Sequence, residues 1–208
     1  MIEDFKKVME TYFTDTSKNE LTFIETGSYE GDGIQIALDY GFKQVRSVEI
    51  TEKYYELCRD RFSDEIECGK VKLYLGDSKE KMSEMTQDVE GKMCFWLDAH
   101  CSYGETGGSE DKNPVLYELN LIKNLKGNDH IIMIDDLRLF RRFDYMHDGW
   151  EVITEQMLID NIKTINKNYE FRYGEKMVTD QVFNTRTLEI EADETCYRDI
   201  LIARTDWR

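Results

Sequence analysis

The sequence predicts an α/β fold with a Rossmann-like, doubly wound, mostly parallel seven-stranded sheet and an antiparallel C-terminal hairpin. Two observations lead to this class. Short apolar runs alternate with segments of helical periodicity up to Asp136, and glycines or acidic residues follow the ends of the apolar runs. Strands that alternate with helices are typical of parallel βαβ units. Because no repeat or linker interrupts the pattern, we expect a single domain spanning residues 1–208.

The individual elements follow from the same pattern. Runs rich in Val, Ile, Phe and Leu predict strands at Leu21–Thr26, Gln44–Glu49, Val71–Leu75, Met93–Asp98 and His130–Asp135. Apolar residues at helical spacing predict helices at Gly33–Tyr40, Glu52–Phe62, Lys79–Asp88 and Val115–Leu125. In the tail we expect a helix at Val152–Ile165 and β-like stretches at Tyr169–Tyr173, Leu188–Glu191 and Ile200–Ala203, which close the sheet with a hairpin.

The composition narrows the function classes. The chain has 27 Lys and Arg against 43 Asp and Glu, a formal net charge of −16. A duplex nucleic-acid binder or an anchor on anionic lipid needs a basic surface, so we expect neither partner. The five cysteines are irregularly spaced and suggest neither a disulfide framework nor a zinc site. Because no segment resembles a signal peptide or a membrane span, we expect a cytoplasmic protein.

A glycine turn follows the first predicted strand. The residues Glu25–Gly33 read ETGSYEGDG, and a strand, a glycine turn and a helix N-terminus together form a site for an anionic ligand group. The glycines are spaced G-x-x-x-G-x-G instead of the dinucleotide pattern G-x-G-x-x-G, which weakens an oxidoreductase reading. Glu49 ends the second strand, where a carboxylate meets ribose hydroxyls. Adenosine joined to a small charged group is therefore favoured.

Three motifs at strand ends resemble class I S-adenosylmethionine methyltransferases, particularly the small metal-dependent O-methyltransferases. They are E-x-G-x-Y-x-G at Glu25–Gly31, V-E-I at Val48–Ile50 and G-D-S at Gly76–Ser78. The resemblance implies that the glycine turn lines the methionine part of S-adenosyl-L-methionine, that the acidic residue of the second motif binds the ribose, and that the third motif borders the adenine. The implied cofactor residues are Glu25, Gly27, Ser28, Tyr29, Gly31, Gly33, Glu49, Asp77 and Ser78.

Acidic residues end the fourth and fifth strands. Asp98 follows one strand and Asp135-Asp136 ends the other, and in a parallel sheet these ends share the edge that carries the glycine turn. Clustered carboxylates repel one another unless a cation lies among them, and oxygen ligands suit Mg²⁺ or Mn²⁺. We therefore predict a metal site at Asp98, Asp135 and Asp136. Sugar O-methyltransferases of antibiotic pathways resemble this arrangement.

Other candidate residues lie after these strands. In the sugar-modifying relatives an acidic general base stands two residues beyond the first metal Asp, so His100 resembles its replacement and, with Asp98, forms the predicted catalytic pair. Cys101 is expected to line the site, and His130 and His147 to be structural. Tyr103, in the turn-rich stretch 102–113, and the cationic Arg138 and Arg141 are candidate substrate contacts, although 138–145 also fits a packed surface helix.

These residues predict a metal-dependent O-methyltransferase that acts on a sugar hydroxyl. The resemblance extends to methyltransferase modules attached to glycosyltransferases in large algal viruses, which suggests a deoxy-sugar such as rhamnose within a glycan. We expect the metal to bind two vicinal hydroxyls and His100 to remove the proton. A catechol-like diol as the acceptor and a catalytically silent Rossmann module that binds a partner are the alternatives. Homodimerisation and attachment to a glycosyltransferase module are left open.

Overall fold

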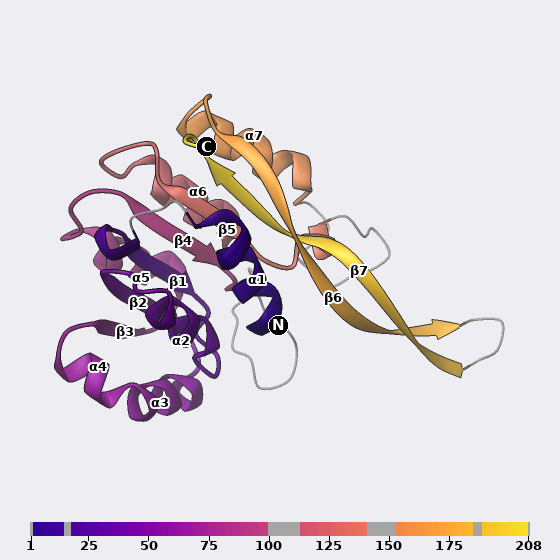
Figure 1. Ribbon diagram of the computed structural model, residues 1–208, viewed down its shortest axis with the longest axis horizontal. Coiled ribbons are helices and arrows are strands. Elements are labelled where there is room, and N and C mark those ends of the chain that lie inside the picture. The colour runs from indigo at the N-terminus through magenta and orange to yellow at the C-terminus, as the bar shows by residue number, and fades with distance from the viewer. Residues whose placement is uncertain (1, 15–17, 100–112, 141–152, 185–188, 208) are drawn as a thin grey trace.

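The computed structural model describes residues 2–14, 18–99, 113–140, 153–184 and 189–207 (Figure 1). Its centre is one sheet with the strand order β3-β2-β1-β4-β5-β7-β6. The strands are β1 (Thr22–Thr26), β2 (Gln44–Glu49), β3 (Val71–Leu75), β4 (Met93–Leu97), β5 (Ile131–Ile134), β6 (Glu170–Asn184) and β7 (Glu189–Arg204).

The first five strands are parallel, and β7 runs antiparallel to both β5 and β6. The predicted class, a mostly parallel seven-stranded sheet with an antiparallel C-terminal hairpin, is confirmed. The strand order reverses between β1 and β4, and the C-terminal ends of the parallel strands open on one edge there. In doubly wound sheets ligands bind at such a switch point. The fold thus brings the glycine turn and the acidic strand ends to one edge.

Two layers of helices cover the sheet because alternate strand residues point to opposite faces. Phe23 and Trp96 lie in the core beneath α1, α2 and α3. Their neighbours Ile24 and Phe95 belong to the core beneath α5, α6 and α7. The helices are α1 (Ile2–Tyr12), α2 (Asp32–Asp39), α3 (Glu52–Arg61), α4 (Ser63–Glu67), α5 (Ser78–Thr86), α6 (Val115–Lys123) and α7 (Glu155–Ile165).

The N-terminal helix α1 was not predicted from the sequence. Its residues Phe5, Val8 and Met9 are buried, at helical spacing, and the ring of Phe5 stacks on that of Trp96 with 4.1 Å between centroids. The side chains of α1 therefore complete the core on one face of the sheet. This partner lies far away in the chain, which is why the short amphipathic segment alone carried little signal. The short helix α4 was also not predicted.

The C-terminal hairpin is longer than the sequence suggested. Two separate β-like stretches belong to one strand, β7, and β6 continues well past Tyr173. Only residues 201–203 of β7 pair with β5, whereas the β6–β7 ladder extends to the pair Asn184 and Glu189. The far part of the hairpin extends away from the sheet (Figure 1). Its register shifts after Gly174, where an added Cβ would lie 2.4 Å from Val8 of α1.

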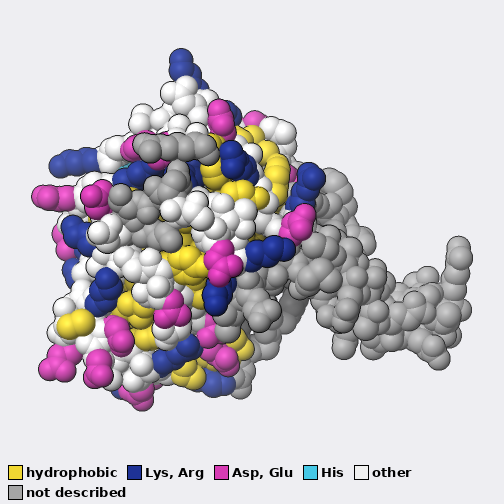
Figure 2. All heavy atoms as spheres, viewed as in Figure 1, with side chains coloured by type: hydrophobic (Ala, Val, Ile, Leu, Met, Phe, Trp, Pro, Cys, Tyr) yellow, Lys and Arg dark blue, Asp and Glu magenta, His cyan; other side chains and the backbone are white. Residues whose placement is uncertain are grey.

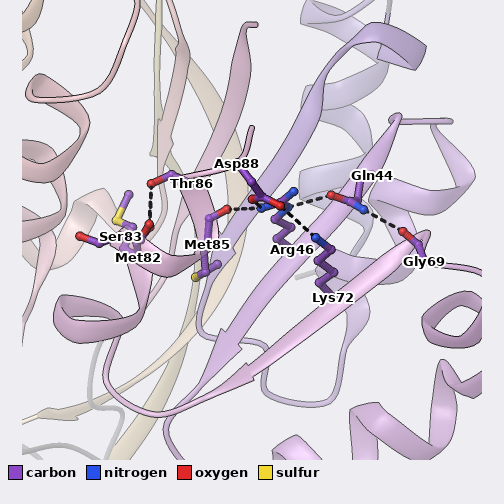
Figure 3. Close-up of polar contacts among 9 residues, drawn as sticks. All are labelled: Gln44, Arg46, Gly69, Lys72, Met82, Ser83, Met85, Thr86 and Asp88. Carbon is purple, nitrogen blue, oxygen red and sulfur yellow. Dashed lines mark hydrogen bonds and ion pairs between the residues drawn. The ribbon is translucent and has the colours of Figure 1, made fainter. Parts of the chain in front are cut away.

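A buried arginine joins β2 to the C-terminal end of α5 (Figure 3). The guanidinium of Arg46 donates hydrogen bonds to the carbonyl of Met85 and to Oε1 of Gln44, each at 2.8 Å, and forms an ion pair with Asp88. Lys72 on β3 contacts the same carboxylate at 3.2 Å. Arg46 is 4% exposed, so these partners satisfy a charge that would otherwise be costly to bury. The contacts anchor the end of α5 remote from its Asp77 cap.

The described surface mixes charges of both signs. In the view of Figure 2, acidic and basic side chains are interspersed over the described residues instead of gathering by sign. Within the described ranges, no helix combines the length and the apolar character that crossing a membrane requires.

Candidate functional site

The glycine turn after β1 is held between two neighbouring strands. The N–H groups of Gly27 and Ser28 donate to the carbonyl of Val48 on β2, at 3.0 and 3.2 Å. Gly27 has a φ of 87°, and a Cβ there would lie 2.7 Å from the carbonyl oxygen of Asp98. Gly31 has a φ of 86°, and its Cβ would lie 2.6 Å from the ring of Phe62. Both positions therefore require glycine for conformation and for space.

Glu49 joins the turn to the start of α3. One carboxylate oxygen accepts the N–H of Tyr29 at 2.9 Å, and the other accepts the N–H of Thr51 at 2.8 Å. Each oxygen has a further lone pair, so the carboxylate could also accept hydroxyl groups of a ligand. Tyr29 has a φ of 45°, and its half-exposed ring packs on Tyr54 with 4.4 Å between centroids. The carboxylate thus holds the backbone of the turn at Tyr29, and the ring of Tyr29 packs on α3 through Tyr54.

Glu25 points into the protein beneath the same turn. Its carboxyl group accepts a hydrogen bond from Ser47 of β2, and the Ser47 and Ser28 hydroxyls are 2.6 Å apart. A Cβ on Gly33 would lie 1.8 Å from Glu25 Oε1, so Gly33 leaves the space that this group fills. Burial, with smaller contributions from nearby carboxylates, raises the pKa of Glu25 to about 8. Ser47 was not predicted, because one serine within a strand is an ordinary residue.

Asp77 and Ser78 form the start of α5. The Asp77 side chain caps the helix by accepting the N–H of Lys79 at 2.9 Å. The N–H of Gly76 donates to the carbonyl of Glu49 at 2.9 Å, which places this helix end beside the second motif. Ser78 is 5% exposed, and its hydroxyl makes no hydrogen bond to any described residue. The structure therefore brings the three predicted cofactor motifs to one edge of the sheet.

A group of three buried carboxylates lies at the other half of this edge. Asp135 and Asp136 follow β5, Asp199 lies on β7, and ligand oxygens of the three lie within 4.8 Å of one another. Asp136 has a φ of 53°, a left-handed conformation in which Asp is several-fold enriched. Such a donor set suits a hard divalent cation. Asp199 was missed because the antiparallel pairing of β7 with β5, invisible in the sequence, brings it here.

Asp98 lies close by but outside that group of three. Its N–H donates to the carbonyl of Thr26 at 3.1 Å, which ties the end of β4 to β1. Asp98, Asp135 and Glu118 of α6 line one small cavity, which we call the acidic cavity. Glu118 is 1% exposed, and it was not predicted from the sequence. Leu97, Ala99, Asn113, Val115, Ile134 and Phe140 complete the lining.

Several predicted residues lie outside the described ranges. They are His100, the predicted base, Cys101, which was expected to line the site, the substrate candidates Tyr103 and Arg141, and His147, which was expected to be structural. Arg138 lies in the short 3₁₀ helix Leu137–Phe140, and the structure describes only its backbone. The base and the substrate contacts therefore remain predictions.

His130 is structural, as predicted. Its Nδ1 accepts the N–H of Met93 at 3.2 Å, and its carbonyl accepts the hydroxyl of Tyr169 at 2.6 Å. Desolvation by burial lowers the pKa of the imidazole. The residue precedes β5 and so lies at the edge of the sheet remote from the glycine turn.

Solved structures share this fold. The O-methyltransferase from Bacillus cereus in complex with S-adenosylhomocysteine (SAH) aligns with a TM-score of 0.55 and 11% identity, covering 99% of this chain and 89% of its own. The SAH-bound methyltransferase PaMTH1 of Podospora anserina gives 0.52 and 14%, covering 100% and 87%. TomG, an O-methyltransferase of Streptomyces achromogenes in tomaymycin synthesis bound to S-adenosylmethionine, gives 0.55 and 10%, covering 88% and 72%. No protein-family model and no curated protein sequence matches the chain.

These likenesses define the fold. The chain has the Rossmann-like fold of class I S-adenosylmethionine-dependent methyltransferases. At such identities a shared fold does not carry over an acceptor or a metal requirement, because one fold supports many chemistries.

Proposed function

We propose that this protein is an S-adenosylmethionine-dependent O-methyltransferase whose acceptor is a sugar hydroxyl. The observation that carries the proposal is the pairing of two features at the β1/β4 switch point. One is the glycine turn tied to Glu49, and the other is the buried acidic group formed by Asp135 and Asp136 after β5 and by Asp199 on β7. Together they offer a cofactor half and an acceptor half at one sheet edge.

The cofactor half fits S-adenosylmethionine. The tight turn at Gly27 lets a ligand approach the backbone, and Glu49 offers lone pairs to the two ribose hydroxyls. Asp77 and Ser78 border the adenine in this assignment, and the unsatisfied Ser78 hydroxyl is one group that a ligand atom could satisfy. The cofactor supplies an activated methyl group on a positively charged sulfur. The chain itself positions the reactants, and their alignment can lower the activation barrier by roughly 7–11 kcal/mol.

The acceptor half fits a divalent metal, Mg²⁺ or Mn²⁺. Asp135, Asp136 and Asp199 would hold the ion, because their ligand oxygens lie within 4.8 Å of one another and carboxylate oxygens are the ligands that a hard divalent cation takes. Bound metal would lower the cost of deprotonating the acceptor hydroxyl. Asp98, at the adjoining acidic cavity, keeps its predicted role as a further ligand, and His100 its predicted role as the base.

The choice of a sugar rests on sequence resemblance, in which the predicted base stands two residues after Asp98. A glycan acceptor, with rhamnose as one candidate, follows from the same resemblance, as do homodimerisation and attachment to a glycosyltransferase module. A catechol-like diol is the second acceptor class, and an acceptor panel with labelled S-adenosylmethionine separates the two. We expect sugars to be methylated in the presence of Mg²⁺, and we expect this methylation to stop in EDTA. Equal activity in EDTA would contradict the metal assignment.

The primary test is calorimetric titration with SAH, because it needs no knowledge of the acceptor. We expect micromolar binding of SAH and none of NAD. Glu49→Gln should weaken SAH binding about tenfold to a hundredfold, the range for a hydrogen bond to a charged group. Glu52→Gln, in the first turn of α3, is the matched control and should bind like the wild type. A folded wild-type protein that does not bind SAH would overturn the methyltransferase proposal and favour a silent binding module.

A further inference from the structure

Glu25 is a buried acid whose surroundings in the protein do little to stabilise its ionised form. The residue is 2% exposed. Its carboxyl group accepts a hydrogen bond from Ser47, whose hydroxyl lies 2.6 Å from that of Ser28 in the glycine turn. Gly33 of α2 leaves the space that Oε1 occupies, because an added Cβ there would lie 1.8 Å from this oxygen. A carboxylate at such a place costs free energy unless a cation lies near it.

Among the described residues, the charged groups that act on Glu25 are acidic. Glu49 on β2 and Asp32 on α2 both disfavour its ionised form. Cys58 of α3 lies against the same turn, and burial raises the pKa of its thiol to about 12, so it stays neutral. Arg61 acts on that thiol, but it is half-exposed and paired with Asp32 at 3.0 Å. On β4, the register places the neutral Trp96 beside Glu25.

We propose that Glu25 keeps its proton in the ligand-free protein and releases it to solvent when an amino-acid cation binds at the glycine turn. The inference rests on the proposed function, which supplies that cation as the α-ammonium group of S-adenosylmethionine or SAH. The reaction is a simple ionisation: the carboxyl O–H bond breaks, the electron pair stays on Glu25, and buffer takes the proton. Opposite charges attract over several ångströms in a low-dielectric interior, so no direct contact is required.

The buried position makes the proton exchange observable near neutral pH. Because the pKa of Glu25 is raised from 4.5 to about 8, the group is mostly protonated at pH 7. A nearby positive charge lowers the pKa of an acid. Ligand binding should therefore release between about 0.5 and 1 proton at pH 7, and the affinity should rise as the pH rises from 6 to 8.

The experiment is calorimetric titration of the full chain with SAH at pH 7 in buffers of different ionisation enthalpy, which counts the protons released. 5′-Methylthioadenosine is the matched ligand, because it keeps the adenosine and the thioether but lacks the ammonium group. We expect proton release with SAH and none with 5′-methylthioadenosine. Glu25→Gln, which keeps an acceptor for Ser47, should abolish the release.

The outcomes separate this inference from the proposed function. Absence of SAH binding would contradict the proposed function itself. SAH binding without proton release, or equal release by both ligands, would overturn the role of Glu25 alone. If Glu25→Gln does not fold, Ser47→Ala decides instead. It removes the donor that favours the ionised form, so proton release should persist and move to higher pH, and an unchanged pH profile would contradict the inference.

Discussion

The edge of the sheet that carries the glycine turn and the acidic residues, called the functional edge, has two halves. The carboxylates in these halves have different surroundings. In the proposed cofactor half, which comprises the glycine turn, Glu49 and Asp77, the backbone N–H groups of Tyr29 and Thr51 donate to Glu49 and that of Lys79 donates to Asp77. In the acidic half, which comprises Asp98, Asp135, Asp136 and Asp199, three carboxylates from two strands lie against one another. The first arrangement holds the glycine turn and the helix starts in place, whereas the second is a donor set that suits a hard divalent cation. Acidic residues on this edge of the sheet can therefore brace the backbone or gather into one group, and the tertiary structure decides which.

The largest expected effect comes from Gly27→Ala, which breaks the contact between the two halves. The new methyl group would lie 2.7 Å from the backbone oxygen of Asp98, at a φ of 87°. We expect SAH binding to fall about a hundredfold, because an extra methyl group in a packed site costs roughly 1–3 kcal/mol and the opposing atom here belongs to the backbone. Gly41→Ala is the control, with a φ of 77° and nothing within 4 Å of its Cβ, so it carries only the conformational cost. Equal binding by both variants would contradict this view of the turn.

Asp199→Asn tests the acidic half by thermal unfolding. Mg²⁺ at a hundred times its dissociation constant should stabilise the wild type by about 2.7 kcal/mol, which raises Tm by roughly 5–10 °C. The variant removes one of the three charges and should lose most of that rise. Asp60→Asn changes a carboxylate that is 79% exposed and should keep the full rise. A wild type whose Tm is the same in Mg²⁺ and EDTA would show that the acidic group binds no such ion.

The apo protein should show the titration of Glu25 in its stability. The folded pKa lies above the unfolded value, so the contribution is complete below pH 4.5 and is lost as the pH rises toward 8. The wild type should therefore lose more stability than Glu25→Gln between pH 5 and 8 in denaturant titrations. Parallel curves for the two proteins would contradict a buried, protonated Glu25.

The smallest effect on ligand binding is expected for Asp88→Asn, in the Arg46 network away from the functional edge (Figure 3). The Arg46 hydrogen bond lowers the pKa of Asp88 to about 2, so its stabilising contribution is lost as the pH falls from 3.8 toward 2. The side chain is 55% exposed, so at pH 7 the substitution should cost less than about 1 kcal/mol. SAH affinity should stay within twofold of the wild type, and a larger change would show that α5 transmits strain to Asp77.

The sequence predicted most of the parallel sheet because the signals there are local. The runs Gln44–Glu49 and Val71–Leu75 became strands with the predicted bounds, and the other three parallel strands differ only at their ends. The C-terminal strands were harder to predict, since β6 and β7 pair mainly with each other over a long ladder and carry no strict alternation. The helix α1 was missed because its apolar face packs on Trp96, a residue far away in the chain, and the segment alone does not reveal this contact.

By itself, the sequence determined the fold class, the glycine turn and the acidic strand ends, because strand periodicity and glycine spacing act over a few residues. The tertiary structure decided which acids meet. It joined Asp199 to Asp135 and Asp136 through antiparallel pairing, and it placed Glu25 against Ser47 beneath the turn. Contacts between residues far apart in the chain depend on strand order and burial, which no local pattern encodes. The charge state of a buried acid depends on those same contacts, and so its role emerges only in the folded protein.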